Sequence, residues 1–180
     1  MQVLNISGMH GKIAMQKDAF SHEYQTLLYN VCRNAYYQIG WNDTDNIEDA
    51  SYVYMHSPLS VNDINSIGLV NELQQTSIFD LVKNLKLQTC VINLSRPGET
   101  YFHHTHANNT KVILYYPNIN WNREWGGETL FYSSTSKELI FANEYVPNTL
   151  LYFDGSIPHT IRAPTYTAPE YRFTISTFWN

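Results

Sequence analysis

The second half of the chain consists of short strand-like segments separated by turns, and this pattern constrains the fold more than any other feature. Apolar, aromatic and β-branched residues gather in short runs, and glycine, proline, asparagine or serine residues separate the runs. These runs cover residues 87–94, 112–116, 129–132, 138–141, 149–153 and 170–179. So many short strands in one half of a chain predict two packed sheets, as in a β-sandwich or a jelly roll.

Helical patterns are confined to the first half. Residues 17–39 repeat apolar side chains at three- and four-residue steps, which predicts an amphipathic helix. Capping pairs predict the starts of two further helices, at Ser60 with Asp63 and at Ser77 with Asp80. The second of these helices is expected to cover residues 78–85.

We therefore predict an α+β fold, in which N-terminal helices buttress a jelly-roll core. The length of 180 residues suits a single domain over residues 1–180. Residues 1–88 are expected to form a mostly helical support, with short strands at 3–6 and 51–55. Residues 89–180 are expected to form the jelly-roll core.

Composition and charge exclude several classes of protein. A hydrophobic content of 43% with 14% aromatic residues is too high for a disordered chain. The net charge of −5 argues against nonspecific binding to nucleic acid or to anionic membranes. No apolar run approaches the roughly 20 residues that span a bilayer. Cys32 and Cys90 lack metal-type spacing and the N-terminus lacks the pattern of a signal peptide, so we expect a cytoplasmic protein.

Histidines form the first candidate site. His104 and His106 lie two residues apart, so on an extended strand both side chains point to the same face. His159 is the sole histidine downstream and is the expected third ligand. Imidazole binds divalent iron, zinc, nickel or copper, and a three-ligand face with open positions supports oxygen chemistry at iron. The alternative is a polar strand end in water.

Arg172 forms the second candidate site. It shares a strand face with the hydroxyls of Thr174 and Ser176, and a guanidinium beside a hydroxyl can clamp a carboxylate. Tyr116 ends a predicted central strand, and its phenol could supply a second bond to the same carboxylate. A metal site together with a carboxylate clamp suggests a chelating keto acid. The alternative is an arginine at the edge of a sheet.

Five separated segments then carry a family resemblance, listed as residues 101–106, 114–118, 121–130, 158–159 and 171–175. In order, spacing and residue type they resemble the iron(II)/2-oxoglutarate-dependent oxygenases, in their prolyl 4-hydroxylase-like branch. The match covers about half of the chain, residues 91–179. It implies a double-stranded β-helix in which His104 and His159 hold iron(II).

The resemblance also implies how the co-substrate binds. 2-Oxoglutarate would lie between the iron and Arg172, with Tyr116 and Thr174 assisting and Tyr101 lining the pocket. The expected activity is hydroxylation of a C–H bond in a second substrate, with release of succinate and carbon dioxide. That substrate is a peptide or a small molecule, with peptidyl proline as one candidate, and ascorbate is a further cofactor that the resemblance allows.

One position departs from the family pattern. The family has an acidic residue two positions after the first histidine, and this chain has His106 there. Either His106 is the third ligand, or the site keeps two protein ligands and a water molecule. A neutral imidazole in place of a carboxylate leaves one more positive charge at the metal, which should favour a dianionic keto acid.

Two other functions remain open at this stage. Gly98 followed by His104-Thr105-His106 resembles the first motif of cupins, which include three-histidine dioxygenases that need no keto acid. The glutamate expected in that motif is absent, since Thr110 and Lys111 occupy its positions. The third alternative is a non-catalytic β-sandwich whose histidines hold zinc or no metal.

Overall fold

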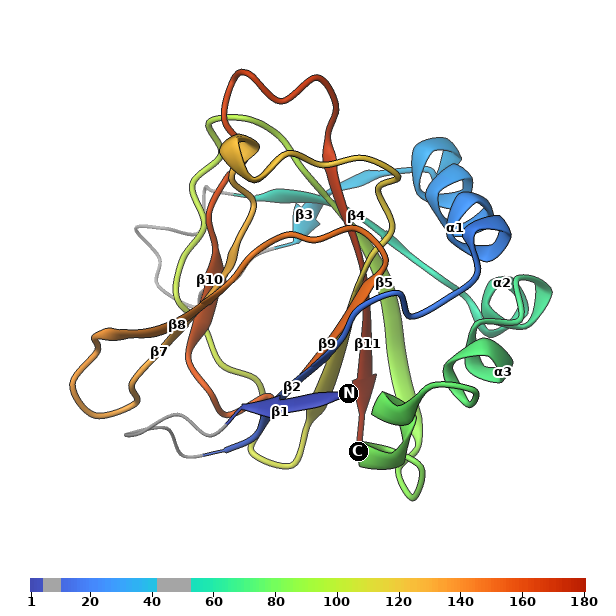
Figure 1. The fold of residues 1–180 in the computed structure, drawn as a ribbon, viewed down its shortest axis with the longest axis horizontal. Coiled ribbons are helices and arrows are strands. Elements are labelled where there is room, and N and C mark those ends of the chain that lie inside the picture. The colour runs from blue at the N-terminus through green and yellow to red at the C-terminus, as the bar shows by residue number, and fades with distance from the viewer. Residues whose placement is uncertain (5–10, 42–52) are drawn as a thin grey trace.

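Two antiparallel sheets form the framework of the protein (Figure 1). This computed structural model describes residues 1–4, 11–41 and 53–180. Within them, the larger sheet has the order β1-β2-β9-β6-β11-β5-β4-β3 and the smaller has the order β10-β7-β8. The larger comprises β1 (Gln2–Leu4), β2 (Ile13–Gln16), β3 (Gln38–Trp41), β4 (Tyr54–Pro58), β5 (Leu87–Ser95), β6 (Lys111–Tyr116), β9 (Thr149–Asp154) and β11 (Arg172–Trp179). The smaller comprises β7 (Thr129–Tyr132), β8 (Leu139–Asn143) and β10 (His159–Ile161).

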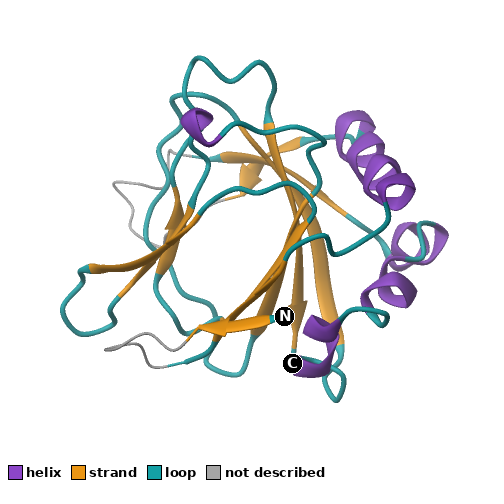
Figure 2. Cartoon of the chain, in the orientation of Figure 1, coloured by secondary structure: helices purple, strands orange, loops and turns teal. Residues whose placement is uncertain are grey.

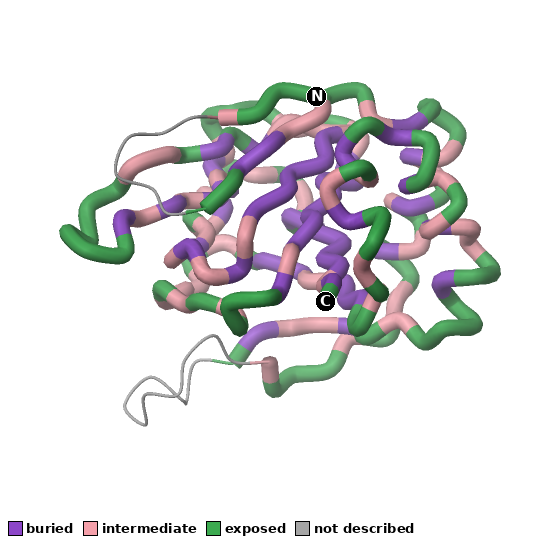
Figure 3. The backbone as a smooth tube through the Cα atoms, turned by 90° about the horizontal axis from the view of Figure 1, so that it is seen from below, coloured by how far each residue is buried: buried purple, intermediate pink, exposed green. Residues whose placement is uncertain are grey.

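The C-terminal strand β11 lies in the middle of the large sheet, between β5 and β6. Almost all of its residues are buried, because both faces of the strand are covered (Figure 3). Phe173 and Ile175 belong to an apolar core on one face, whereas Arg172, Thr174 and Ser176 line a cavity on the other. The alternating sequence of this strand therefore reflects two buried faces of different chemistry.

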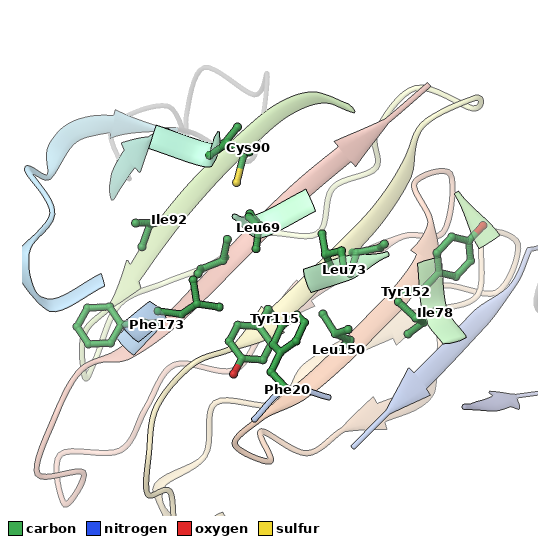
Figure 4. Close-up of a cluster of buried hydrophobic side chains, with 14 of the residues drawn as sticks. Phe20, Leu69, Leu73, Ile78, Cys90, Ile92, Tyr115, Leu150, Tyr152 and Phe173 are labelled. Carbon is green, nitrogen blue, oxygen red and sulfur yellow. The ribbon is translucent and has the colours of Figure 1, made fainter. Parts of the chain in front are cut away.

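Helices cover the outer face of the large sheet, beside β5 and β11 (Figure 2). In the described residues these are α1 (His22–Asn34), α2 (Val61–Ser66) and α3 (Leu69–Leu73). Leu69 and Leu73 of this layer share one core with Ile92 and Phe173 of the sheet (Figure 4). Burial of these apolar faces attaches the helices to the sheet.

The helix predicted over residues 17–39 is shorter than its pattern indicates. Ser21 is its N-cap and accepts a hydrogen bond from the backbone N–H of Tyr24 (3.2 Å). The backbone becomes extended at Ala35, and residues 38–41 form β3 against β4. The C-terminal end of this helix is therefore set by the pairing of β3 with β4. The spacing of apolar residues within 17–39 does not predict that pairing.

The two predicted helix starts have different outcomes. The capping box is confirmed, since Ser60 Oγ accepts from the N–H of Asp63, and the Asp63 carboxylate accepts from the N–H of Ser60 (2.8 Å). Gly68, with a φ of 66°, separates α2 from α3. The helix predicted over 78–85 is wrong in type, because the chain forms a short 3-10 helix, η1 (Ser77–Leu81), with Thr76 as its N-cap.

The first third of the chain contributes strands as well as helices. Strands β1 to β4 occupy the two edges of the large sheet, so residues 1–88 contain more strand than their sequence predicts. The strands predicted at 3–6 and 51–55 lie partly outside the described residues, and their described parts belong to β1 and β4. Such short segments show too few periods for a reliable pattern.

In the described ranges no helix is both long and apolar enough to cross a membrane.

A second core fills part of the space between the two sheets. Leu114, Leu151 and Phe153 of the large sheet meet Phe131 of the small sheet. Successive residues of β6 alternate between this core and the helix-side core, so its continuous apolar run is buried on both faces. The inner core ends at a cavity, which holds the candidate site.

Candidate functional site

A cavity that is partly open to solvent is lined by residues from both sheets. Its polar lining comprises Asn93, Ser95, Tyr101, His104, His106, Thr129, His159, Thr160, Arg172, Thr174 and Ser176. Its apolar and aromatic walls include Trp41, Tyr54, Val112, Leu114, Phe153, Ile161 and Phe178.

The three predicted metal-binding histidines meet in this cavity. One potential ligand nitrogen from each of His104, His106 and His159 lies within 4.8 Å of the others. His104 forms an isolated β-bridge with His159, through two backbone hydrogen bonds of 3.0 Å. Two residues after His104, the backbone N–H of His106 donates to the carbonyl of Gly155 (2.7 Å). Backbone pairing therefore brings together side chains that are far apart in the sequence.

Backbone carbonyls orient two of the imidazole rings. Nδ1 of His104 lies 3.2 Å from the carbonyl oxygen of Phe102, and Nδ1 of His159 lies 2.8 Å from that of Ile157. A neutral imidazole that donates its Nδ1–H to such an oxygen carries its lone pair on Nε2, which is then the nitrogen that a metal binds. The ring of His106 is instead packed edge-on against Phe178, with centroids 5.0 Å apart.

Burial keeps two of these imidazoles neutral. Burial, assisted by the neighbouring His104, lowers the pKa of His106 to about 4. Burial also lowers the pKa of His159 well below its ordinary value, with smaller contributions from the other two histidines. A metal binds the neutral form of imidazole, so the site does not have to lose protons before it accepts a cation at neutral pH.

Gly155 makes the position of His106 possible. A Cβ atom at this position would lie 2.9 Å from the His106 Cβ and 2.9 Å from the Thr110 carbonyl oxygen. Real Cβ contacts are essentially never that short, so a larger residue would displace the segment that carries His106. The sequence alone did not reveal this close approach.

Arg172 is buried and is only 1% exposed. Its Nε donates to the carbonyl of Gly127 (2.8 Å), and one terminal nitrogen donates to Thr129 Oγ1 (3.4 Å). The guanidinium also lies over the ring of Tyr145, 4.9 Å from its centroid. Among the described residues no carboxylate forms an ion pair with it. A buried cation without a counter-ion is costly, and an anionic ligand in the cavity would relieve that cost.

Tyr116, the predicted carboxylate-binding phenol, lies beside the Arg172 guanidinium, 5.6 Å from its ring centroid, and is not among the residues that line the cavity. It is fully buried, its hydroxyl lies 2.8 Å from Thr129 Oγ1, and it accepts a bond from Asn143 (3.2 Å). Thr129, which the sequence did not single out, occupies the cavity wall in its place. Thr174 and Tyr101 both line the cavity.

Similar solved structures support this architecture. No family model matches the chain, and the search of curated proteins gives no match. Among solved structures, a prolyl-4-hydroxylase from Pseudomonas putida is 14% identical, covers 93% of this chain and 92% of its own, and has a TM-score of 0.63. A 2OG-Fe(II) oxygenase family oxidoreductase from Burkholderia pseudomallei is 9% identical, with coverage of 93% and 85% and a TM-score of 0.67.

A third similar structure contains a peptide. It is a prolyl hydroxylase from Trichoplax adhaerens in complex with a hypoxia inducible factor fragment, 14% identical, with coverage of 93% and 82% and a TM-score of 0.57. At these identities the likeness concerns the fold. The jelly-roll core and the resemblance predicted from the sequence are therefore confirmed at the level of the fold.

Proposed function

We propose that this chain, which has the fold of the iron(II)/2-oxoglutarate oxygenases, is a 2-oxoglutarate-dependent iron(II) dioxygenase. It would hydroxylate a C–H bond of a second substrate and release succinate and carbon dioxide. One observation carries the proposal: a buried arginine, Arg172, has no acidic partner in the described residues and lines the same cavity as three convergent imidazoles. A cavity with a cation-binding end and an anion-binding group suits a metal and a chelating dicarboxylate.

The donor set fits a divalent metal ion. His104, His106 and His159 would hold iron(II), and backbone carbonyls beside the Nδ1 atoms orient the imidazole rings of the first and last. Iron(II), bound at these residues, would supply the activation of dioxygen. His106 replaces the carboxylate that the family pattern has, so the three protein ligands are neutral and the metal keeps its full positive charge. This charge favours a dianionic co-substrate.

The opposite end of the cavity fits the distal carboxylate of 2-oxoglutarate. Gly127 and Thr129 occupy two of the five Arg172 donors, and the remaining N–H groups can form a bidentate ion pair. The hydroxyl of Thr174, which is 3% exposed, lies on the same strand face. Tyr116 assists indirectly, because its phenol holds the Thr129 hydroxyl.

We propose a peptide or small-molecule substrate, with peptidyl proline as the leading candidate. Two of the similar structures are prolyl hydroxylases, and one of them is in complex with a peptide fragment. The aromatic rings of Trp41 and Tyr54 line the cavity and offer flat apolar surfaces against which the pyrrolidine ring of a proline could pack. Assays would include ascorbate, which keeps the iron reduced.

The proposal is tested without turnover. Iron(II) and then 2-oxoglutarate are added to metal-free protein in the absence of oxygen, and the weak visible absorption of an iron-chelated keto acid is recorded. The band should form in the wild type, disappear in Arg172→Ala, and persist in Arg123→Ala, which removes an exposed arginine from a short 3-10 helix, η2 (Arg123–Trp125). Absence of the band from wild-type protein with bound iron would contradict the proposal.

The three-histidine donor set favours one alternative. A cupin-type dioxygenase needs three imidazoles and no keto acid, and therefore gives Arg172 no role. Metal binding that is retained while 2-oxoglutarate fails to bind would support this alternative. If the protein binds zinc but shows no turnover with iron, in the presence or absence of 2-oxoglutarate, it would instead be a non-catalytic metal-binding β-sandwich.

A further inference from the structure

The side chain of Glu99 lies next to the cavity wall and is mostly buried, with 10% of its surface exposed. Both of its oxygens are engaged. The backbone N–H of Arg96 donates to Oε2 (2.8 Å), and the Arg96 guanidinium donates to Oε1 (2.7 Å). The hydroxyl of Tyr101 donates to Oε2 as well. Glu99 is therefore anchored by Arg96 whether or not Tyr101 bonds to it.

Tyr101 bonds to this carboxylate and lines the cavity that also holds the buried arginine. It lines the cavity together with Ser95 and Arg172, which are paired in register on adjacent strands. Burial raises the pKa of the Tyr101 phenol and the Glu99 carboxylate raises it further, whereas Ser95 and the positive charge of Arg172 act in the opposite direction. The phenol therefore feels the charge of an anion, Glu99, and that of a cation, Arg172.

The ring of Tyr101 is fixed while its O–H bond remains free to rotate. The ring stacks on Tyr54, with centroids 4.6 Å apart and an interplanar angle of 24°. The hydroxyl of Tyr54 donates to the carbonyl of Thr100 (2.8 Å), which ties this pair to the same loop. Rotation about the C–O bond is thus enough to redirect the proton from one acceptor to another.

A phenol has a single proton to donate. Without a ligand, that proton goes to Glu99. A carboxylate bound by Arg172 becomes a second acceptor beside the same phenol, and the proton cannot serve both carboxylates. Bonds to a charged acceptor are roughly twice as strong as neutral ones, so the choice of acceptor affects how tightly the ligand is held.

We infer that Glu99 is a positioning residue that lowers the affinity of the cavity for an anionic co-substrate, because it competes for the hydroxyl proton of Tyr101. The inference rests on the function proposed above and specifies how the affinity of that site is set. Glu99→Gln keeps the shape of the side chain and removes its charge. In either orientation, the amide holds the phenol proton less strongly than the carboxylate does, and the proton becomes available to the ligand.

The test measures binding of 2-oxoglutarate to the iron(II)-loaded protein by calorimetry without oxygen. Glu99→Gln should bind about threefold to tenfold more tightly than the wild type, and Tyr101→Phe should bind more weakly by a similar factor, as expected for one hydrogen bond. In the Tyr101→Phe background, Glu99→Gln should change the affinity less than about twofold. Glu124→Gln is the matched control, because it removes the same charge from an exposed pair with Arg123.

Each outcome has a distinct meaning. Unchanged or weaker binding by Glu99→Gln overturns the inference, because the carboxylate would then have no competing role. Tighter binding that persists in full without the phenol also overturns it, since the effect would come from charge alone. Binding that is lost in Arg172→Ala and unaffected by Glu99→Gln leaves the proposed function standing. Absence of binding in the wild type overturns both.

Discussion

Replacing Gly155 with alanine should weaken metal binding, although this residue offers no ligand atom. The new Cβ would lie 2.9 Å from the His106 Cβ and 2.9 Å from the Thr110 carbonyl oxygen, whereas ordinary contacts begin at 3.4 Å. The two segments must therefore separate by about 0.5 Å, the difference between these two distances. The Gly155 carbonyl, which accepts the His106 N–H, moves with them. Overpacking of this kind typically costs about 1–3 kcal/mol of stability.

The metal affinity is the more specific measurement. A ligand that loses its supporting contacts typically lowers the affinity of a site by about 10- to 100-fold. Calorimetric titration of the metal-free protein with zinc(II) and with iron(II) should show a loss of this size in Gly155→Ala. Thermal unfolding without metal records the loss of stability separately.

Gly68→Ala is the matched control for Gly155→Ala. Gly68 joins two helices, its φ is 66°, and no atom lies within 4 Å of the position of its Cβ. The substitution costs stability through backbone strain, and it does so far from the metal ligands. It should therefore leave the metal affinity unchanged. Equal metal affinities in wild type and Gly155→Ala, or equal losses in the two glycine variants, would refute the steric argument.

Other perturbations separate the metal ligands from the groups that bind the co-substrate. His159→Ala should lower the affinity for zinc(II) in calorimetry by more than about 100-fold, whereas His22→Ala on the exposed face of α1 should leave it unchanged; equal affinities would remove His159 from the ligand set. In succinate-release assays, Arg172→Ala should raise the Michaelis constant for 2-oxoglutarate more than it lowers the maximal rate, and an unchanged constant would show that the clamp is misassigned. Tyr116→Phe should weaken 2-oxoglutarate binding by only about threefold, because its phenol acts through a neighbouring threonine; a loss as large as that of Arg172→Ala would indicate direct contact. Because burial lowers the pKa of His106 to about 4, the unfolded chain binds a proton between pH 6.5 and about 4 that the folded chain does not. Urea unfolding of the metal-free protein should therefore show that the free energy of unfolding decreases as the pH is lowered through this window, by up to about 1.4 kcal/mol per pH unit. A free energy of unfolding that does not change with pH would contradict a buried neutral imidazole.

Local chemistry was readable wherever it depends on residues close together in the sequence. The two-residue spacing of His104 and His106 put both imidazoles on one face, because side chains alternate along extended backbone. The same alternation put Arg172 and Thr174 on a common face, and both line the cavity. The capping box at the start of α2 was readable for a similar reason, since its two hydrogen bonds join residues three apart.

Contacts between distant segments were not readable in this way. The depth at which Tyr116 lies depends on how β6, β7 and β8 pack, and this packing puts Thr129 at the cavity wall instead. The end of α1 depends on pairing of β3 with β4, and the edge strands of the large sheet depend on partners from the other half of the chain.

The sequence by itself determined the two-sheet jelly-roll core, the histidine pair and the polar face of β11, because strand periodicity acts within a few residues. Tertiary structure alone decided that His159 pairs with His104, that Gly155 admits His106, and that the buried guanidinium of Arg172 has no acidic partner in the described residues. Each of these features depends on the distance between segments that fold against one another. Such distances are set by sheet register and packing, which no local pattern encodes.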